Sequence, residues 1–206
     1  MNLFEDKLLD VNHKQDYRII GQLFDTYWLI EFEDSFYMMD QHAAHEKILY
    51  ERLMKQFHEK TYHSQMIMPP VILTLSLREE QILKENWKTF TALGYEIEEF
   101  GGKEYKVTGL PAELPTVIDC KQLLIELIDT IADESATHDP ERITEKVASM
   151  SCKAAVKGNN RLSFKEAEEL MRELMEAENP YNCPHGRPTL IKMTKYEIER
   201  KFKRIL

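Results

Sequence analysis

Three short runs rich in aromatic and aliphatic residues lie near the start of the chain, at 17–23, 27–32 and 36–40. Runs of this length and composition are typical of β-strands, and the polar break Glu33-Asp34-Ser35 predicts a hairpin between the last two. The spacing then becomes helical, because apolar residues recur every three or four positions from 41 to about 58. The pattern therefore predicts three strands followed at once by a long helix.

The middle of the chain alternates between extended and helical patterns. Residues 65–75 contain two prolines and several β-branched residues, which favour an extended chain. Strands are predicted near 95–100 and 104–109, because a Gly101-Gly102 turn separates them. Helices are predicted near 119–132 and after Pro140, a residue that suits the first turn of a helix.

The starts of three further helices are marked by capping boxes, in which Ser or Thr is followed by Glu three residues later. The pairs are Ser76/Glu79, Ser163/Glu166 and Thr194/Glu197. In each pair the two side chains accept hydrogen bonds from backbone N–H groups that the first helical turn leaves unpaired. The third pair predicts that the basic end of the chain begins as a helix.

The order of the elements predicts a mixed α/β (α+β) fold in which one segment is inserted into another. Residues 1–15 are polar and mixed, and we interpret them as a linker remnant. The polar stretch 133–140 is interpreted as a crossing point between subdomains. On this interpretation 63–140 forms an αβ lobe, inserted into a domain that is built from 16–62 and 141–206.

The chain is acidic, with 27 Lys and Arg against 36 Asp and Glu among 206 residues, a net charge of −9. Neutralisation of phosphates is the main source of non-specific DNA affinity, so this chain is expected to bind DNA poorly by itself. One basic run opposes the trend and is either a solvated helix face or a DNA-facing patch. It contains Lys192, Lys195, Arg200, Lys201, Lys203 and Arg204 against Glu197 and Glu199.

The composition also predicts the cellular location of the protein. No window approaches the roughly 20 apolar residues of a membrane span, and no basic-then-apolar leader begins the chain. We therefore expect a soluble, cytoplasmic protein without a membrane partner. The cysteines Cys120, Cys152 and Cys183 are too few for a disulfide framework, so metal ligation or burial is expected instead.

A first group of candidate metal ligands lies where the third strand meets the long helix. Asp40 closes the strand, while His42 and Glu46 are four residues apart and so share one face of the helix. Carboxylate oxygen and imidazole together suit Mn²⁺, Mg²⁺ or Zn²⁺, and the alternative is that Asp40 only caps the helix. His45 lies one step off this face and is expected to be supporting or exposed. Glu51 has turned roughly 180° away from His42, so it is expected to be a structural carboxylate.

A second group lies in the segment Cys-Pro-His-Gly-Arg-Pro-Thr at 183–189. Cys183 and His185 are two residues apart, and in an extended segment such side chains share a face and can chelate one ion. Arg187 is expected to hold a phosphate or to pair with Asp40 or Glu46. The alternative is a rigid loop whose cysteine is simply buried.

A third block, Ser-Cys-Lys-Ala-Ala-Val-Lys-Gly at 151–158, falls on the helix after Pro140. Cys152 lies beside the apolar face of that helix, so it is either a metal ligand or a buried small hydrophobe. Lys153 and Lys157 are four residues apart on the same helix.

These blocks together resemble the C-terminal endonuclease and dimerisation domain of bacterial MutL DNA mismatch-repair proteins. Asp-Gln-His-Ala, two residues, Glu, four residues and Glu at 40–51 match the endonuclease signature of that family, and 183–189 matches its second motif. The block 151–158 resembles its alanine-cysteine-basic motif, with Ser151 where Ala is usual. Phe202-Lys203-Arg204 fits a fourth motif, F-x-R. The family's fold is a dimerisation subdomain interrupted by an external regulatory lobe, here 63–140.

The resemblance implies a metal-dependent enzyme that hydrolyses a DNA phosphodiester with metal-bound water and leaves a nick in duplex DNA. Family members depend on Mn²⁺ for the cut and bind Zn²⁺ as a regulatory ion, and the candidate ligands of this chain also suit Mg²⁺. Asp40 and Glu46 are expected to be catalytic, with Glu46 bridging two ions. The expected metal ligands are Asp40, His42, Glu46, Cys152, Cys183 and His185. The residues expected to support DNA binding or the structure are Lys153, Arg187 and Glu51.

The resemblance also implies partners. Gln65, Met68 and Pro70 fit a Q-x-x-hydrophobic-x-Pro pattern with which family members dock the replication sliding clamp, and the alternative is an ordinary edge strand. A second copy of the chain, duplex DNA and, in the full-length protein, the mismatch-recognition protein MutS are the other expected partners. No Gly-rich phosphate loop is present, so ATP is expected to bind only a separate N-terminal domain outside this chain.

Two other functions remain open. A non-catalytic dimerisation module would not need the block at 40–51. A zinc-stabilised regulatory domain would keep Cys183 and His185 but would not need Asp40.

Overall fold

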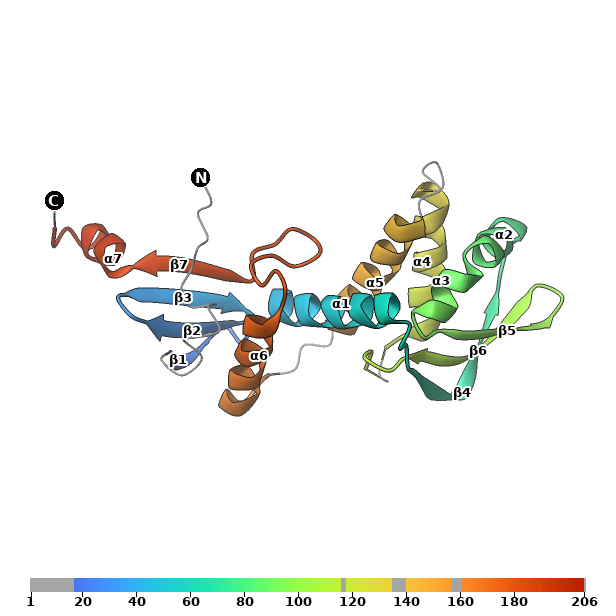
Figure 1. The fold of residues 1–206 in the computed structure, drawn as a ribbon, viewed down its shortest axis with the longest axis horizontal. Helices are drawn as coiled ribbons and strands as arrows, with labels where there is room; N and C mark the ends of the chain where they lie inside the picture. Colours follow the sequence, from blue (N-terminus) through green and yellow to red (C-terminus); the bar gives the residue numbers. More distant parts are fainter. Residues whose placement is uncertain (1–16, 116–117, 135–139, 157–160, 206) are drawn as a thin grey trace. The chain divides into compact units, whose positions relative to one another are not determined.

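The computed structural model describes residues 17–115, 118–134, 140–156 and 161–205 (Figure 1). The linker predicted at 1–15 and most of the crossing point predicted at 133–140 lie outside these residues. The chain forms two compact units, one from Met1–Ile48 with Gly158–Leu206 and the other from Leu49–Lys157. Among the described residues, no helix is both long enough and apolar enough to cross a membrane.

The first unit is built on a four-stranded antiparallel sheet in the order β1-β2-β3-β7 (Figure 1). The strands are β1 (Arg18–Leu23), β2 (Tyr27–Phe32), β3 (Ser35–Asp40) and β7 (Leu190–Thr194). The predicted hairpin is confirmed, because β2 ends and β3 begins on either side of Glu33 and Asp34. β7 leads directly into the short helix α7 (Lys195–Lys201).

One face of this sheet forms the core of the first unit. Side chains alternate between the two faces of a strand, and Trp28, Ile30 and Met39 all belong to the buried set. They pack with the first two turns of α1 (Gln41–Glu59), through Ala44 and Ile48, and with α6 (Phe164–Glu176). The residues of α6 in this core are Ala167, Leu170, Met171, Leu174 and Met175.

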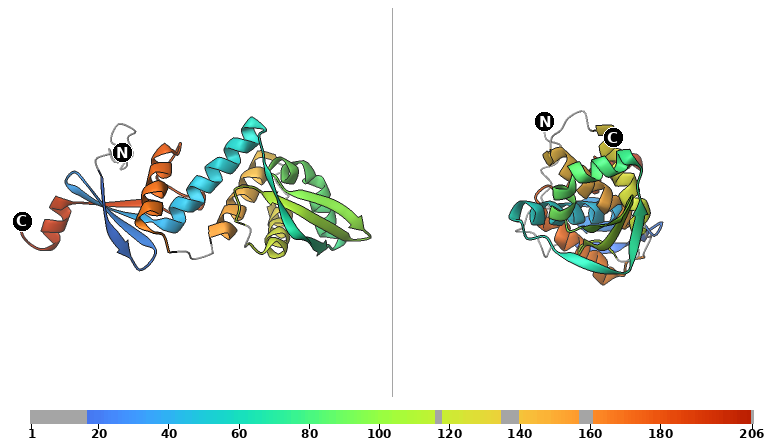
Figure 2. Two further views of the ribbon diagram at one scale, coloured as in Figure 1. Left: turned by 90° about the horizontal axis from the view of Figure 1, so that it is seen from below. Right: turned by 90° about the vertical axis from the view of Figure 1, so that its right-hand side faces the viewer.

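The second unit contains a three-stranded antiparallel sheet in the order β4-β6-β5, and its strands lie side by side in Figure 2. They are β4 (Ser64–Thr74), β5 (Glu96–Gly101) and β6 (Glu104–Pro111). The other elements are the later turns of α1 with α2 (Leu77–Glu85), α3 (Trp87–Ala92), α4 (Cys120–Glu134) and α5 (Pro140–Val156).

Packing divides the chain at different residues from the predicted subdomains. Leu53 and Met54 of α1 and Val147 and Ala148 of α5 are buried in the core of the second unit, together with β4, β6 and α4. The second unit therefore extends beyond 63–140 on both sides. The assignment of a regulatory role to the inserted segment stays a prediction. The mixed α+β fold itself is confirmed.

Candidate metal centre

The pairing of β3 with β7 brings the two ligand-bearing blocks together. The strands are antiparallel, and Met39 lies opposite Leu190. The residue that ends β3 therefore meets the residue that precedes β7: the backbone N–H of Asp40 donates to the carbonyl of Thr189 at 2.9 Å. The pairing of these two strands thus places residues about 150 positions apart in the sequence side by side.

The segment at 183–189 is a tight turn, not the extended segment that the sequence analysis assumed. The N–H of Cys183 donates to the carbonyl of Arg187, and the N–H of Gly186 donates to the carbonyl of Cys183, each at 2.9 Å. Gly186 has φ +78°, in the left-handed region that a glycine adopts without the penalty a side chain brings. Asn182 forms a β-bridge with Pro188 where the turn closes. The backbone of this turn is therefore fixed on both sides of His185.

Three candidate ligands converge at this turn. The ligand atoms of Glu46, Cys183 and His185 all lie within 4.8 Å of one another. Glu46 Oε2 is 3.1 Å from His185 Nδ1, and the Glu46 side chain is only 4% exposed. Cys183 is buried as well. Thiolate, imidazole and carboxylate are the ligand types that zinc prefers, so the donor set fits that ion.

Arg187 completes the cluster by pairing with Glu46, one of the two carboxylates predicted for it. Its Nη2 lies 2.6 Å from Glu46 Oε2. The hydrogen bond to Glu46 raises the pKa of Arg187, burial opposes the rise, and a hydrogen bond with Cys183 adds to it. The guanidinium therefore interacts with two of the three candidate ligands.

Asp40 and His42 lie nearby in sequence but outside this three-residue cluster, as far as the described residues go. Asp40 Oδ1 accepts hydrogen bonds from the backbone N–H groups of His42 at 2.9 Å and Ala43 at 3.1 Å. The carboxylate thus satisfies orphan donors at the start of α1, as the capping alternative predicted. His42 Nδ1 lies 4.0 Å from the same oxygen, and both side chains are about a quarter exposed. Their roles as metal ligands stay predictions.

His45 does not join the ligand cluster. Burial lowers the pKa of His45, and the neighbouring His42 lowers it further. The side chain of His45 is half-buried, and this environment favours the neutral imidazole.

The remaining predicted site residues belong to the second unit. Cys152 is fully buried in the core of that unit. It thus behaves as a buried small hydrophobe, and its role as a metal ligand stays a prediction. Lys153 is exposed on α5, and Glu51 is half-buried on α1.

Gln41 is a residue of the site region whose role was not predicted from the sequence. It is 3% exposed, and its Oε1 accepts hydrogen bonds from Trp28 Nε1 at 3.3 Å and Gln22 Nε2 at 3.2 Å. The side chain therefore fastens the start of α1 to β1 and β2. The available signal was its spacing with Ala44 and Ile48, which places all three on the buried face of the helix.

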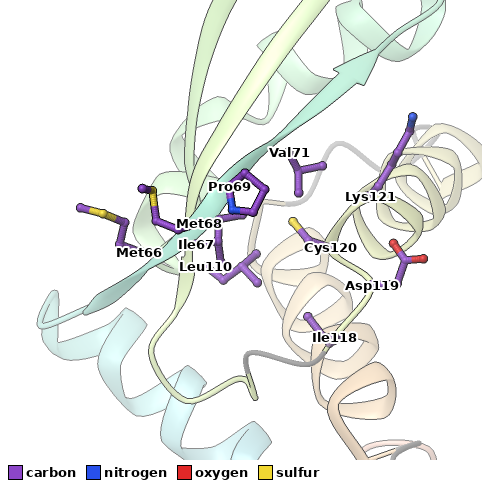
Figure 3. A pocket seen from close by; sticks show the side chains of 10 residues that line it. All are labelled: Met66, Ile67, Met68, Pro69, Val71, Leu110, Ile118, Asp119, Cys120 and Lys121. Carbon is purple, nitrogen blue, oxygen red and sulfur yellow. The ribbon is translucent and has the colours of Figure 1, made fainter.

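The predicted clamp segment lies on β4 and borders a groove of about 510 Å³ (Figure 3). The ladder with β6 shifts register between Met66 and Val71, and both Met66 and Met68 are more than 70% exposed. Gln65 is engaged within the unit, since its Nε2 donates to the carbonyls of Pro111 at 3.1 Å and Leu114.

Comparison with known proteins agrees with the family resemblance. Residues 20–162 match the family model described as the MutL C-terminal dimerisation domain. A DNA mismatch repair protein MutL from Agathobacter rectalis is 52% identical over 98% of this chain and 31% of its own length. A MutL from Caldanaerobacter subterraneus subsp. tengcongensis is 39% identical over 97% of this chain and 33% of its own length. The chain spans about a third of the length of these relatives. It belongs to the MutL C-terminal dimerisation domain family.

Proposed function

We propose that the first unit is the metal-dependent nuclease centre of a DNA mismatch-repair protein and that it nicks duplex DNA. The observation that carries this proposal is the cluster of Glu46, Cys183 and His185, beside the carboxylate of Asp40 at the start of α1. A dimerisation module without catalytic activity would need neither the buried Glu46 nor its convergence with a thiol and an imidazole.

The chain's residues suit two kinds of ion. Cys183, His185 and Glu46 would hold Zn²⁺, whereas Asp40 and His42 offer the harder oxygen and nitrogen ligands that also suit Mn²⁺. Such ions, when bound, neutralise charge on a phosphate and activate water. Asp40 keeps the start of α1 in place through its two backbone hydrogen bonds. Arg187 is about half exposed, and its guanidinium carries the N–H donors that suit a phosphate.

Delivery of DNA is expected to come from elsewhere in the full-length protein or from a partner. The net charge of −9 opposes binding to a polyanion. A clamp that encircles DNA would raise the effective concentration of DNA at the site without new contacts to the bases.

The test is nicking of supercoiled plasmid by the full-length protein with Mn²⁺, with Zn²⁺ and with neither ion, each with and without the sliding clamp. The proposal predicts Mn²⁺-dependent nicks that disappear when Glu46 is replaced by Gln. Activity that survives Glu46→Gln in a metal-loaded protein would refute the assignment of the cluster. No nicking under any condition, with wild-type metal content, would favour the zinc-stabilised regulatory domain.

A second function, assembly of two copies, is supported by the open face of the four-stranded sheet. Leu29, Met38 and Ile191 lie opposite one another on adjacent strands, on the face away from the buried Trp28 and Met39. This row is apolar, and Ile191 is 52% exposed. Burial of such a row against a second copy is the expected use of an exposed apolar sheet face in a family of dimerisation domains.

Sedimentation of this chain at micromolar concentration should therefore give about 49 kDa, twice the 24.4 kDa of one chain. Met38→Glu combined with Ile191→Glu should give a folded monomer, because the introduced carboxylates of the two copies would repel one another across the interface. Phe100→Glu, a matched change at an exposed aromatic residue of the second unit, should remain a dimer. A monomeric mass for the wild-type chain would refute the proposal that two copies assemble.

We further propose that Met68 and Pro70 dock the sliding clamp. Met68 is 79% exposed and Pro70 is also exposed, so both are accessible to a partner. Met68→Ala with Pro70→Ala should abolish the stimulation of nicking by the clamp, while metal content and clamp-independent nicking stay at wild-type values. Full stimulation of the double variant would show that the segment is only a strand.

A further inference from the structure

The Glu46 carboxylate has two partners within the cluster. Its Oε2 accepts from Arg187 Nη2 at 2.6 Å and lies 3.1 Å from His185 Nδ1. The Glu46 side chain is 4% exposed, and a buried carboxylate without a cation is strongly destabilising. Arg187 therefore supplies the counter-charge for the buried Glu46 carboxylate.

The same guanidinium opposes a metal ion. It hydrogen-bonds to Glu46 and interacts with Cys183, so a fixed positive charge lies against two of the three ligands that a dication needs. Like charges at such short range repel, most strongly where water is excluded. The oxygen that accepts from Arg187 also lies 3.1 Å from His185 Nδ1, so the arginine and the histidine contact the same carboxylate oxygen.

We propose that Arg187 is a placeholder cation, which holds the Glu46 oxygen in the metal-free protein and must be displaced for a metal ion to bind. The inference rests on the proposed metal site and specifies how that site is regulated. It makes Arg187 a positioning residue that keeps the three ligands together without a metal ion and lowers their metal affinity. The opposite role is the usual one for a partner of a metal ligand, whose removal costs roughly 10- to 100-fold in affinity.

A placeholder and a supporting partner are distinguished by whether zinc affinity rises or falls when Arg187 is replaced. Zinc affinity of this chain would be measured by competition with a chromophoric chelator, for wild type, Arg187→Gln and Arg172→Gln. Arg172 pairs with Glu169 and Glu176 on the surface of α6, so its variant has the same net charge without touching the cluster. The placeholder predicts that Arg187→Gln binds zinc about tenfold more tightly or better, whereas Arg172→Gln matches wild type.

Thermal unfolding gives a readout that is independent of chelators. Without zinc, Arg187→Gln should melt below wild type, because the buried Glu46 loses its arginine partner, and saturating zinc should remove the difference. Unchanged or weaker zinc binding by Arg187→Gln overturns the placeholder. If the wild-type chain binds no zinc, both the proposed metal site and the placeholder role of Arg187 are refuted. If the wild-type chain binds zinc but Arg187→Gln does not bind it more tightly, only the placeholder role is refuted.

A measurement on the wild-type chain covers the case in which Arg187→Gln does not fold without metal. Phenylglyoxal modifies free guanidinium groups, and peptide mass spectrometry reports the rate at each arginine. Zinc should speed the modification of Arg187 several-fold while leaving Arg172 in the same sample unchanged. Protection of Arg187 by zinc, or no change, would show that the guanidinium stays on Glu46 and would refute displacement.

Discussion

Asp40 caps helix α1 in the structure and is also proposed to be catalytic, and two substitutions separate these roles. Its Oδ1 accepts hydrogen bonds from two backbone N–H groups at the start of α1, at 2.9 and 3.1 Å. Its negative charge is also the proposed catalytic contribution. Asparagine caps helices as well as aspartate does, because its carbonyl oxygen accepts the same hydrogen bonds. Asp40→Asn therefore removes the charge and keeps the cap, whereas Asp40→Ala removes both.

The two substitutions are expected to change the stability of the chain by different amounts. Loss of a helix cap costs about 1 kcal/mol, and in a chain of this length that lowers the melting temperature by about 2–4 °C. Asp40→Ala should show this decrease, and Asp40→Asn should stay within about 0.5 kcal/mol of wild type. If the charge is catalytic, both variants should lose nicking, so Asp40→Asn should be stable and inactive.

Circular dichroism melting of this chain and plasmid nicking by the full-length protein with Mn²⁺ measure the two effects. Asp25→Asn is the matched control, because it makes the same substitution at an exposed carboxylate that pairs with Arg161 in the same unit. It should retain nicking. Wild-type nicking by Asp40→Asn would reduce Asp40 to a cap and refute its catalytic role. Equal destabilisation of Asp40→Asn and Asp40→Ala would contradict the capping argument.

Three further predictions follow from the described contacts. Cys183→Ser with His185→Ala should remove most bound zinc by elemental analysis, whereas Cys120→Ser should keep it; a large loss of melting temperature in the double variant would favour the zinc-stabilised alternative. Ser163→Ala should cost about 1 kcal/mol in denaturant unfolding, because its hydroxyl caps α6. Gln65→Ala should cost roughly 1–3 kcal/mol by the same assay, because its amide donates to carbonyls within the second unit.

Local signals predicted most of the secondary structure. All three capping boxes are present, with both reciprocal hydrogen bonds in each. Helix caps and strand alternation act over a few residues, so the sequence displays them directly. The unit boundaries depend instead on long-range packing. Leu53 of α1 is buried in the second unit and Ile48 in the first, although helical spacing gives both the same character.

The site was predicted in part for the same reason. The residue types identified Glu46, Cys183 and His185 as candidate ligands, but their convergence depends on the register of β3 with β7. The pairing of Arg187 with Glu46 could be stated only as one of several alternatives, because spacing does not show which carboxylate a distant arginine reaches. Gln41 was missed because its partners, Trp28 and Gln22, lie on other strands.

The β3–β7 ladder connects the two proposed functions of the first unit. Met38 and Ile191 face outward from this ladder as part of the proposed dimer surface. The next pair along, Met39 and Leu190, leads directly to the Asp40–Thr189 hydrogen bond that holds the ligand-bearing turn beside α1. A second copy that covers the outward face would therefore stabilise the strands that set the ligand positions. The monomeric Met38→Glu, Ile191→Glu variant should then bind zinc more weakly than wild type, although neither residue is a ligand. Equal zinc affinity in monomer and dimer would show that the ladder keeps its register without a partner and that assembly and metal binding are independent.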